Sequence, residues 1–198
     1  MRFSRLLAGV VPATAALLLT GCISLGGGEA PDQLLTLTAS AMAPAGAATQ
    51  GQMSGALSVT EPAVPQHLNL TRVPVRVDGT TLAYLKDAVW VEKPARLFQR
   101  VVAETIRARG TRMVVGGGEL DYAAQTQLAG ELSAMDYDAT TGEVLVRYDA
   151  VLRLPGGEVR TRRFESRVSG VAADALSVAP AINRAANDVA AQVADWVG

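Results

Sequence analysis

The segment EVLVRYDAVLRL, residues 143–154, carries the strongest structural signal of this chain because its apolar and polar side chains alternate. One set is apolar or aromatic: Val144, Val146, Tyr148, Ala150, Leu152 and Leu154. The other set carries the charges, at Glu143, Arg147, Asp149 and Arg153. Side chains two residues apart lie on one face of a strand, so the pattern predicts a strand with one buried and one solvated face.

The flanking sequence extends this strand into an antiparallel meander. Segments 138–142 and 155–157 contain the glycine, aspartate and proline typical of turns, and they predict a hairpin on each side. Residues 125–137 also alternate, with Leu128, Gly130, Leu132 and Ala134 expected on one face. After the second turn, Phe164, Ser166 and Val168 continue the pattern.

Shorter apolar runs predict four more strands, at 34–38, 57–60, 73–77 and 113–115. Proline cannot donate a ladder hydrogen bond, so Pro74 places its run at a sheet edge or at a strand start. Residues 39–55 carry no charge and are rich in Ala, Gly, Gln and Pro, which predicts a flexible loop.

Two segments, 94–109 and 181–197, repeat apolar side chains at three- and four-residue steps and are expected to form helices. Pro94 suits the first turn of one helix, while Asp174 or Ser177 can cap the other, with Pro180 in its first turn. The order β-β-β-α-β-β-β-β-α predicts a single α/β domain, a mixed and mostly antiparallel sheet with two helices packed on it.

Composition excludes several classes of function. The 198 residues carry a formal charge of −1, so no general electrostatic attraction to nucleic acid is expected. A single cysteine cannot form an internal disulfide, and a single histidine cannot build a histidine-rich metal site. We therefore expect no metal and no cofactor.

The single cysteine ends a secretion signal. Arg2 and Arg5 precede an apolar stretch, residues 6–19, that is too short to span a bilayer comfortably. The tetrapeptide that follows, Leu19-Thr20-Gly21-Cys22, resembles the bacterial lipobox, which the lipoprotein signal peptidase recognises. We predict that Cys22 receives acyl chains such as palmitate, and that several chains on one residue anchor the protein stably.

The predicted organisation is a signal peptide at 1–21, a lipidated tether at 22–32 and one α/β domain at 33–198. Ile23 stands where enteric sorting would need an aspartate to retain a lipoprotein on the inner membrane. We therefore expect anchoring at the periplasmic face of the outer membrane.

Three motifs suggest chemistry and are interpreted structurally. Gly116–118 follow a strand, but no phosphate-loop spacing is present, so we interpret them as a turn. Asp136-Tyr137-Asp138 begins like a calcium loop without its remaining ligands and is interpreted as a hairpin end. His67 is the only imidazole, and no nucleophile elbow accompanies it, so we do not expect it to be catalytic.

Two further groups have both a structural and a binding interpretation. The first group is the late-strand arginines Arg147, Arg153, Arg160, Arg162, Arg163 and Arg167. They could bind anionic lipid or a partner. We favour the other interpretation, in which they pair with the interspersed carboxylates on a solvated sheet face. Trp90 and Tyr84 contact a partner or have a structural role, and for Trp90 we favour the core. The loops at 39–55 and 79–93 are our candidates for a partner surface.

The mature sequence resembles the ABC-type transport auxiliary lipoproteins of the PqiC type, which accompany MCE-domain lipid transporters. The resemblance is carried by Cys22, the run 33–37, the segment VTEPAVPQHL at 59–68, Leu82-Ala83-Tyr84, and Trp90 four residues before Pro94. It implies an α/β sandwich without enzymatic activity.

The resemblance also implies partners and a position in the cell. The partners would be an inner-membrane ABC permease and ATPase with a substrate-binding MCE protein, for which the lipoprotein, similar to a ring-forming dock, aligns the tunnel at the outer membrane. A different class remains open, an envelope assembly lipoprotein for an outer-membrane β-barrel or lipopolysaccharide complex. A lipoprotein hydrolase using His67 is a third class, which we disfavour.

Overall fold

The computed structural model describes residues 33–116 and 123–198. The predicted signal peptide, the lipobox with Cys22, the tether and most of the glycine turn at 116–118 lie outside the described residues. Residues 31–198 form one compact unit with a continuous core of their own. No helix in the described ranges is long and apolar enough to cross a membrane.

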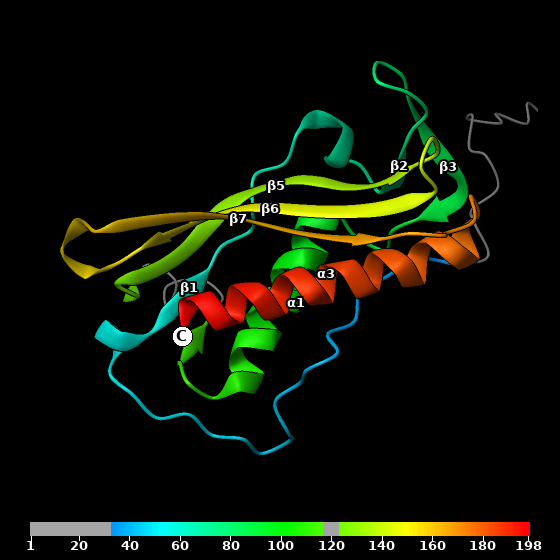
Figure 1. The fold of residues 1–198 in the computed structure, drawn as a ribbon. Helices are drawn as coiled ribbons and strands as arrows, with labels where there is room; N and C mark the ends of the chain where they lie inside the picture. Colours follow the sequence, from blue (N-terminus) through cyan, green and yellow to red (C-terminus); the bar gives the residue numbers. More distant parts are fainter. Residues whose placement is uncertain (1–32, 117–122) are drawn as a thin grey trace, which may run out of the picture. The chain divides into compact units, whose positions relative to one another are not determined.

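The predicted meander forms the larger part of the sheet (Figure 1). Its strands are β5 (Thr126–Asp138), β6 (Glu143–Arg153) and β7 (Val159–Val168), each antiparallel to the next. Cross-strand partners share a face, so Leu132, Tyr148 and Phe164, which pair in register, are all buried on the same side. The expectation of a mixed, mostly antiparallel sheet in an α/β domain is confirmed.

Strand β5 is the branch point of the sheet. Its free edge pairs in parallel with β1 (Leu57–Val59) near its start and with β2 (Arg72–Arg76) at its end. Two outer strands complete the seven, β4 (Val114–Val115) parallel to β1, and β3 (Leu82–Val89) antiparallel to β2. Between the two branches, Ala63 forms a parallel bridge with Glu131, and the short helix η2 (Gln66–Leu68) follows it.

The two predicted helices pack on the buried face of the sheet. Helix α1 (Pro94–Arg109) has the expected bounds and ends at Gly110, which adopts the left-handed conformation. Helix α3 (Ala175–Val197) starts earlier than predicted, because the Asp174 side chain caps it by accepting a hydrogen bond from the Ser177 N–H at 2.9 Å. Pro180 therefore lies inside the helix, near its exposed start, where water can reach the carbonyl that the proline leaves unpaired.

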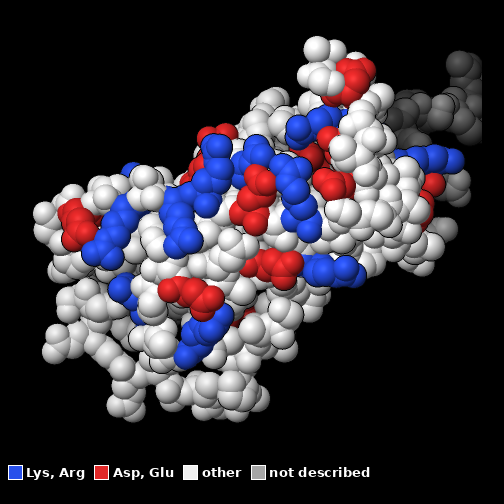
Figure 2. All heavy atoms as spheres, in the orientation of Figure 1, with Lys and Arg blue, Asp and Glu red and all other residues white. Residues whose placement is uncertain are grey.

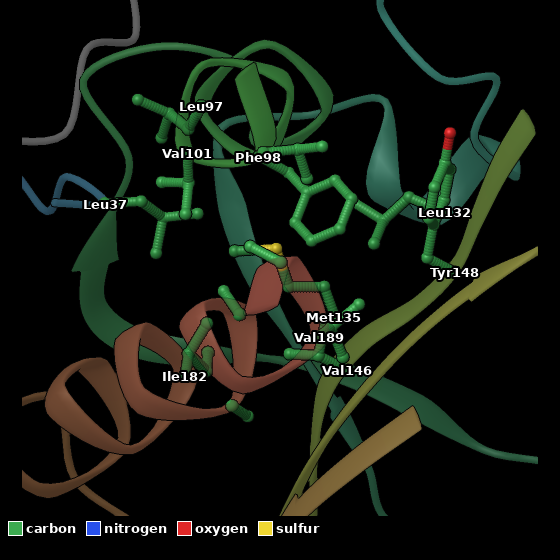
Figure 3. Close-up of a cluster of buried hydrophobic side chains, with 14 of the residues drawn as sticks. Leu37, Leu97, Phe98, Val101, Leu132, Met135, Val146, Tyr148, Ile182 and Val189 are labelled. Atoms are coloured by element: carbon green, nitrogen blue, oxygen red, sulfur yellow. The ribbon is translucent and has the colours of Figure 1, made fainter. Parts of the chain in front are cut away.

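The core lies between these helices and the meander (Figure 3). The Phe98 ring of α1 meets the Tyr148 ring of β6 edge-to-face, with ring centroids 5.3 Å apart. From α3, Ile182 and Val189 point into the same cluster, where they are completely buried. The alternating side chains of 143–154 thus supply one wall of the core, as their pattern predicts.

One predicted strand is absent and one strand was missed. At 34–38 only Leu35 forms a bridge, with Trp90, because the next backbone donors bind side chains instead. The N–H groups of Thr38 and Ser40 donate to Asn183 and Asn187 of α3, at 2.8 and 2.7 Å. Strand β3 escaped prediction because it lies outermost beyond β2 and half of its residues are exposed in adjacent pairs, so no alternation marks it.

Two details of the sequence interpretation are wrong. Strand β2 lies between β3 and β5, so Pro74 is not at an edge. It is tolerated because the ladder to β5 uses only Val75 and Arg76, and the ladder to β3 shifts register beside the proline. Ala134 does not share the face of Leu132, because a bulge between them changes the register and Ala134 pairs with Arg147.

We predict that Gly130→Ala destabilises the domain by about 2–4 kcal/mol, because a methyl group there meets the β6 backbone. Gly130 has φ of 149°, and a Cβ atom would lie 2.1 Å from the Asp149 carbonyl oxygen. Urea unfolding followed by circular dichroism measures the change. Gly79→Ala is the matched control, since a Cβ at Gly79 meets nothing within 4 Å. Equal stability of both variants would contradict the argument.

Candidate functional site

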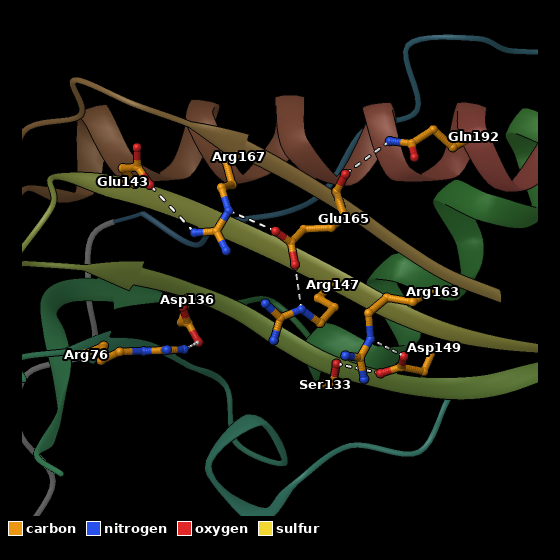
Figure 4. Close-up of polar contacts among 10 residues, drawn as sticks. All are labelled: Arg76, Ser133, Asp136, Glu143, Arg147, Asp149, Arg163, Glu165, Arg167 and Gln192. Carbon is orange, nitrogen blue, oxygen red and sulfur yellow. Dashed lines mark hydrogen bonds and ion pairs between the residues drawn. The ribbon is translucent and has the colours of Figure 1, made fainter. Parts of the chain in front are cut away.

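The outer face of the sheet carries an ordered network of ion pairs (Figure 4). Glu165 of β7 accepts from Arg147 of β6 at 2.6 Å and from Arg167 of its own strand at 2.8 Å. Asp149 accepts from Arg163 at 2.6 Å and from the Ser133 hydroxyl at 2.9 Å. These hydrogen bonds hold the pKa of the Glu165 and Asp149 carboxyls below their ordinary values.

The network follows directly from strand register. Arg147 pairs opposite Glu165, and Asp149 pairs opposite Arg163, so each charge meets its opposite across the ladder. Cross-strand pairing therefore accounts for three of the six late-strand arginines, Arg147, Arg163 and Arg167, the last through Glu143 of β6. The same interpretation does not cover Arg153 and Arg162, for which no carboxylate partner lies among the described residues.

A cleft of about 290 Å³ opens where η2 lies against the outer face of β2 and β5. It is lined by His67, Arg76, Ser133, Asp136 and the exposed turn at 78–82. His67 and Asp136 are 69 positions apart in the sequence, and no sequence motif connects them. The fold brings them to one cleft because the segment 60–71 passes between the two branches of the sheet.

Asp136 is the unusual group of this cleft. Its carboxylate is 2% exposed, and one oxygen, Oδ2, accepts from Arg76 at 3.0 Å. The second oxygen, Oδ1, is buried without a hydrogen-bond partner among the described residues. Burial is the dominant influence and raises the pKa of Asp136 above its ordinary value, although the Arg76 guanidinium acts in the opposite direction.

The cleft does not assemble an activated nucleophile. A hydroxyl, an imidazole and a carboxylate all line it, but the Ser133 hydroxyl donates to Asp149 and the Asp136 carboxylate accepts from Arg76. Nucleophilic catalysis requires the hydroxyl to donate to the base, and the base to be oriented by the acid. In the described ranges no group of three or more His, Cys, Asp or Glu side chains is placed to hold a metal ion.

The two residues suggested as partner contacts, Trp90 and Tyr84, differ in how deeply they are buried. Trp90 is 2% exposed and belongs to the core, where it has a structural role. Tyr84 is half-buried on β3, with the Arg72 guanidinium 4.7 Å from its ring centroid. The candidate loop at 79–93 is mostly strand β3, whose side chains are exposed at four of its eight positions, as are those of the turn before it.

The segment 39–55 is held to both helices at its start. Asn187 is 8% exposed and donates to the Thr38 carbonyl at 2.9 Å while accepting from Ser40. Glu104 of α1 accepts from the Ala43 N–H at 2.9 Å. Asn183 and Asn187 are four residues apart on α3, beside its apolar stripe, and this spacing is the signal in the sequence for the attachment.

We predict that Asp136→Asn removes a pH dependence of stability. Because burial raises the folded-state pKa of Asp136, the folded protein binds this proton more tightly than the unfolded chain does. The free energy of unfolding therefore falls as pH rises from 3.8, the ordinary aspartate value, through the raised pKa. Relative to Asp136→Asn, the native protein should lose stability in urea unfolding as pH rises above 3.8.

Asp138→Asn is the control of opposite sign. Hydrogen bonds from Thr140 hold the pKa of Asp138 below its ordinary value, so its contribution is present at neutral pH and is lost on acidification. A difference of the same sign for both variants would contradict the assignment for Asp136.

Comparisons with known proteins identify a family for this chain. A family described as ABC-type transport auxiliary lipoprotein component matches residues 35–194, which is most of the chain. A crystal structure of a Xanthomonas campestris protein is similar with a TM-score of 0.68 at 18% identity, over 83% of this chain and 94% of that one. An uncharacterized protein of known structure is similar with a TM-score of 0.62 at 14% identity, over 76% and 97% of the two chains.

No curated protein sequence matches the chain. The two structural likenesses establish the shared fold, and the family match extends from the Leu35 bridge to the last turns of α3. The resemblance seen in the sequence is confirmed, and the chain belongs to the family of ABC-type transport auxiliary lipoprotein components.

Proposed function

We propose that the protein is a non-catalytic lipoprotein that docks or aligns an MCE-domain substrate-binding protein at the periplasmic face of the outer membrane. The observation that carries the proposal is the family match over residues 35–194. It associates the chain with an ABC transport system in the cell envelope. The MCE partner, its inner-membrane permease and ATPase, and the outer-membrane position come from the resemblance to the PqiC type.

The lipid anchor is proposed from the sequence. Cys22 follows Leu19-Thr20-Gly21 at the end of a signal peptide, and residues 23–32 connect it to the first described residue, Gln33. Ten residues span at most about 36 Å when extended, so the domain would stay close to its membrane. Such confinement raises the local concentration of a docking component at the site where a partner arrives.

A positional role also fits the polar chemistry of the domain. The hydroxyl of Ser133 and the carboxylate of Asp136 are engaged by Asp149 and Arg76, which favours a structural use of the cleft over a hydrolytic one. We propose that transport energy comes from the partner ATPase. We further propose that copies of the chain assemble into a ring around the MCE tunnel.

The segment 39–55 is our candidate for the partner contact. It carries no charge, and its Met42 side chain is exposed although its backbone is attached to α3 and α1 nearby. Together with the last turn of α1 it borders a hollow of about 550 Å³. A segment that is held at one end and exposed along its length can adapt to a partner without disturbing the core.

Co-purification tests the transport assignment. Full-length lipoprotein extracted from native membranes in mild detergent should bring an MCE protein, a permease and an ATPase, identified by mass spectrometry. An outer-membrane β-barrel or another assembly component in their place would favour the alternative class.

The same co-purification tests the partner contact. Asn187→Ala, which releases the start of segment 39–55, should lower the yield of the MCE protein severalfold. Gln192→Ala, a loss of one exposed contact on the same helix, is the control.

A second prediction concerns the anchor. Cys22→Ala should accumulate as unprocessed or mislocalised precursor, because the thiol that accepts the acyl chains is absent. Palmitate labelling and membrane fractionation measure the loss, and Ser24→Ala, two residues beyond the lipobox, should be labelled like the native protein. Normal processing and labelling of the Cys22 variant would refute the anchor.

A further inference from the structure

The hairpin between β6 and β7 extends beyond the rest of the domain. Figure 1 shows it reaching past the C-terminal end of α3. Every residue from Pro155 to Arg163 is exposed, and the burial of β7 begins only at Phe164. We name residues 153–163 the β6–β7 arm. Leu154 packs against the core, but the described residues from Pro155 to Arg163 are exposed, so packing does not explain the identity of the three arginines among them.

The arm is strongly basic. It carries Arg153, Arg160, Arg162 and Arg163 against one acidic residue, Glu158, a formal charge of +3. Figure 2 shows blue side chains in a row over the band that β5, β6 and β7 form. The whole chain has a formal charge of −1, so this positive charge is a local feature.

The pairing that neutralises the outer face is incomplete on the arm, where two of the four arginines have a carboxylate partner. Arg163 still meets Asp149, and Arg160 meets Glu158 at 2.7 Å, with both side chains more than half exposed. Arg153 donates to the neutral Gln127, and Arg162 lies 5.1 Å from the centroid of the Phe164 ring. Stacking on an aromatic ring orients a guanidinium and leaves its N–H groups available for an anion.

From this geometry we propose that the β6–β7 arm binds the surface of an anionic lipid bilayer. Basic clusters on exposed segments bind anionic headgroups through charge complementarity that needs no fixed partner geometry. Val159, which is 55% exposed between these arginines, supplies an apolar side chain for the interfacial region. A partner protein would instead need a matched array of carboxylates, and long exposed arginines on both faces of a hairpin favour a diffuse layer of phosphates.

The inference rests on the proposed function only in that the lipid anchor would bring the arm to a membrane. Charged side chains on an edge strand also prevent two copies from pairing edge to edge. The two roles make different predictions, because prevention of pairing does not require an attraction to anionic lipid. A vesicle assay combined with a measurement of oligomeric state therefore separates them.

The experiment uses the chain from residue 23 onward without its acyl groups, since residues 31–198 form a compact unit with its own core. It should bind vesicles of phosphatidylglycerol and phosphatidylethanolamine, not vesicles of phosphatidylcholine, and binding should weaken as salt is raised. Each arginine near such a surface contributes about 1 kcal/mol, or roughly fivefold. Arg160→Gln combined with Arg162→Gln should therefore weaken binding by about 25-fold in vesicle sedimentation.

The matched control is Arg96→Gln combined with Arg100→Gln on α1. It removes the same charge from side chains that are 65% and 50% exposed, and it should bind like the native chain. Equal losses in both double variants, or equal binding to neutral vesicles, would overturn the proposal. Size-exclusion chromatography and circular dichroism must show the same oligomeric state and fold for all chains. The two proposals can fail separately. If the chain binds anionic vesicles but no transporter component co-purifies with it, the transport role is refuted and the membrane-binding arm stands.

Discussion

The structure depends on the antiparallel pairing of β5 with β6. Most of β5 lies opposite β6, and Gly130 allows the two backbones to approach so closely that a Cβ atom there would collide with the Asp149 carbonyl. A bulge at Ser133 then changes which side chains face the helices. Leu132 before the bulge and Met135 after it both enter the core, although strict alternation would place them on opposite faces.

The same bulge determines the polar chemistry of the outer face. It turns Asp136 away from the helices, and the segment that carries His67 covers the strand there, so a carboxylate becomes buried beside Arg76. A buried ion pair with one unsatisfied oxygen is weak evidence for stability, because desolvation offsets the Coulomb attraction. It does favour one register of β2 on β5, since another register would leave the charge of Asp136 buried without its partner.

The surface of the domain is divided between neutralised and uncompensated charge. Across β6 and β7 the arginines meet carboxylates in register, and surface pairs of this kind each contribute roughly 0.2–1 kcal/mol. Beyond the end of α3 this compensation is incomplete, because Arg153 and Arg162 have no carboxylate partner among the described residues, and a basic arm remains. A lipoprotein that positions a transport partner needs surfaces that meet a membrane and a protein. In our proposals the arm meets the membrane and the segment 39–55 meets the protein partner, and the two belong to different parts of the domain.

The elements whose signals are local could be predicted from the sequence. Alternation over 143–154 gave the central hairpins, the three- and four-residue steps gave both helices, and the family could be recognised from short motifs around Trp90 and Pro94. Four features could not be predicted and depend on contacts between distant segments. They are the branching of β5, the strand β3, the attachment of Thr38 and Ser40 to asparagines of α3, and the position of His67 and Asp136 in one cleft. The physical reason is that periodicity records which face of an element is buried. It does not record which distant backbone or side chain supplies the partner, and that choice is made by pairing between segments far apart in the chain.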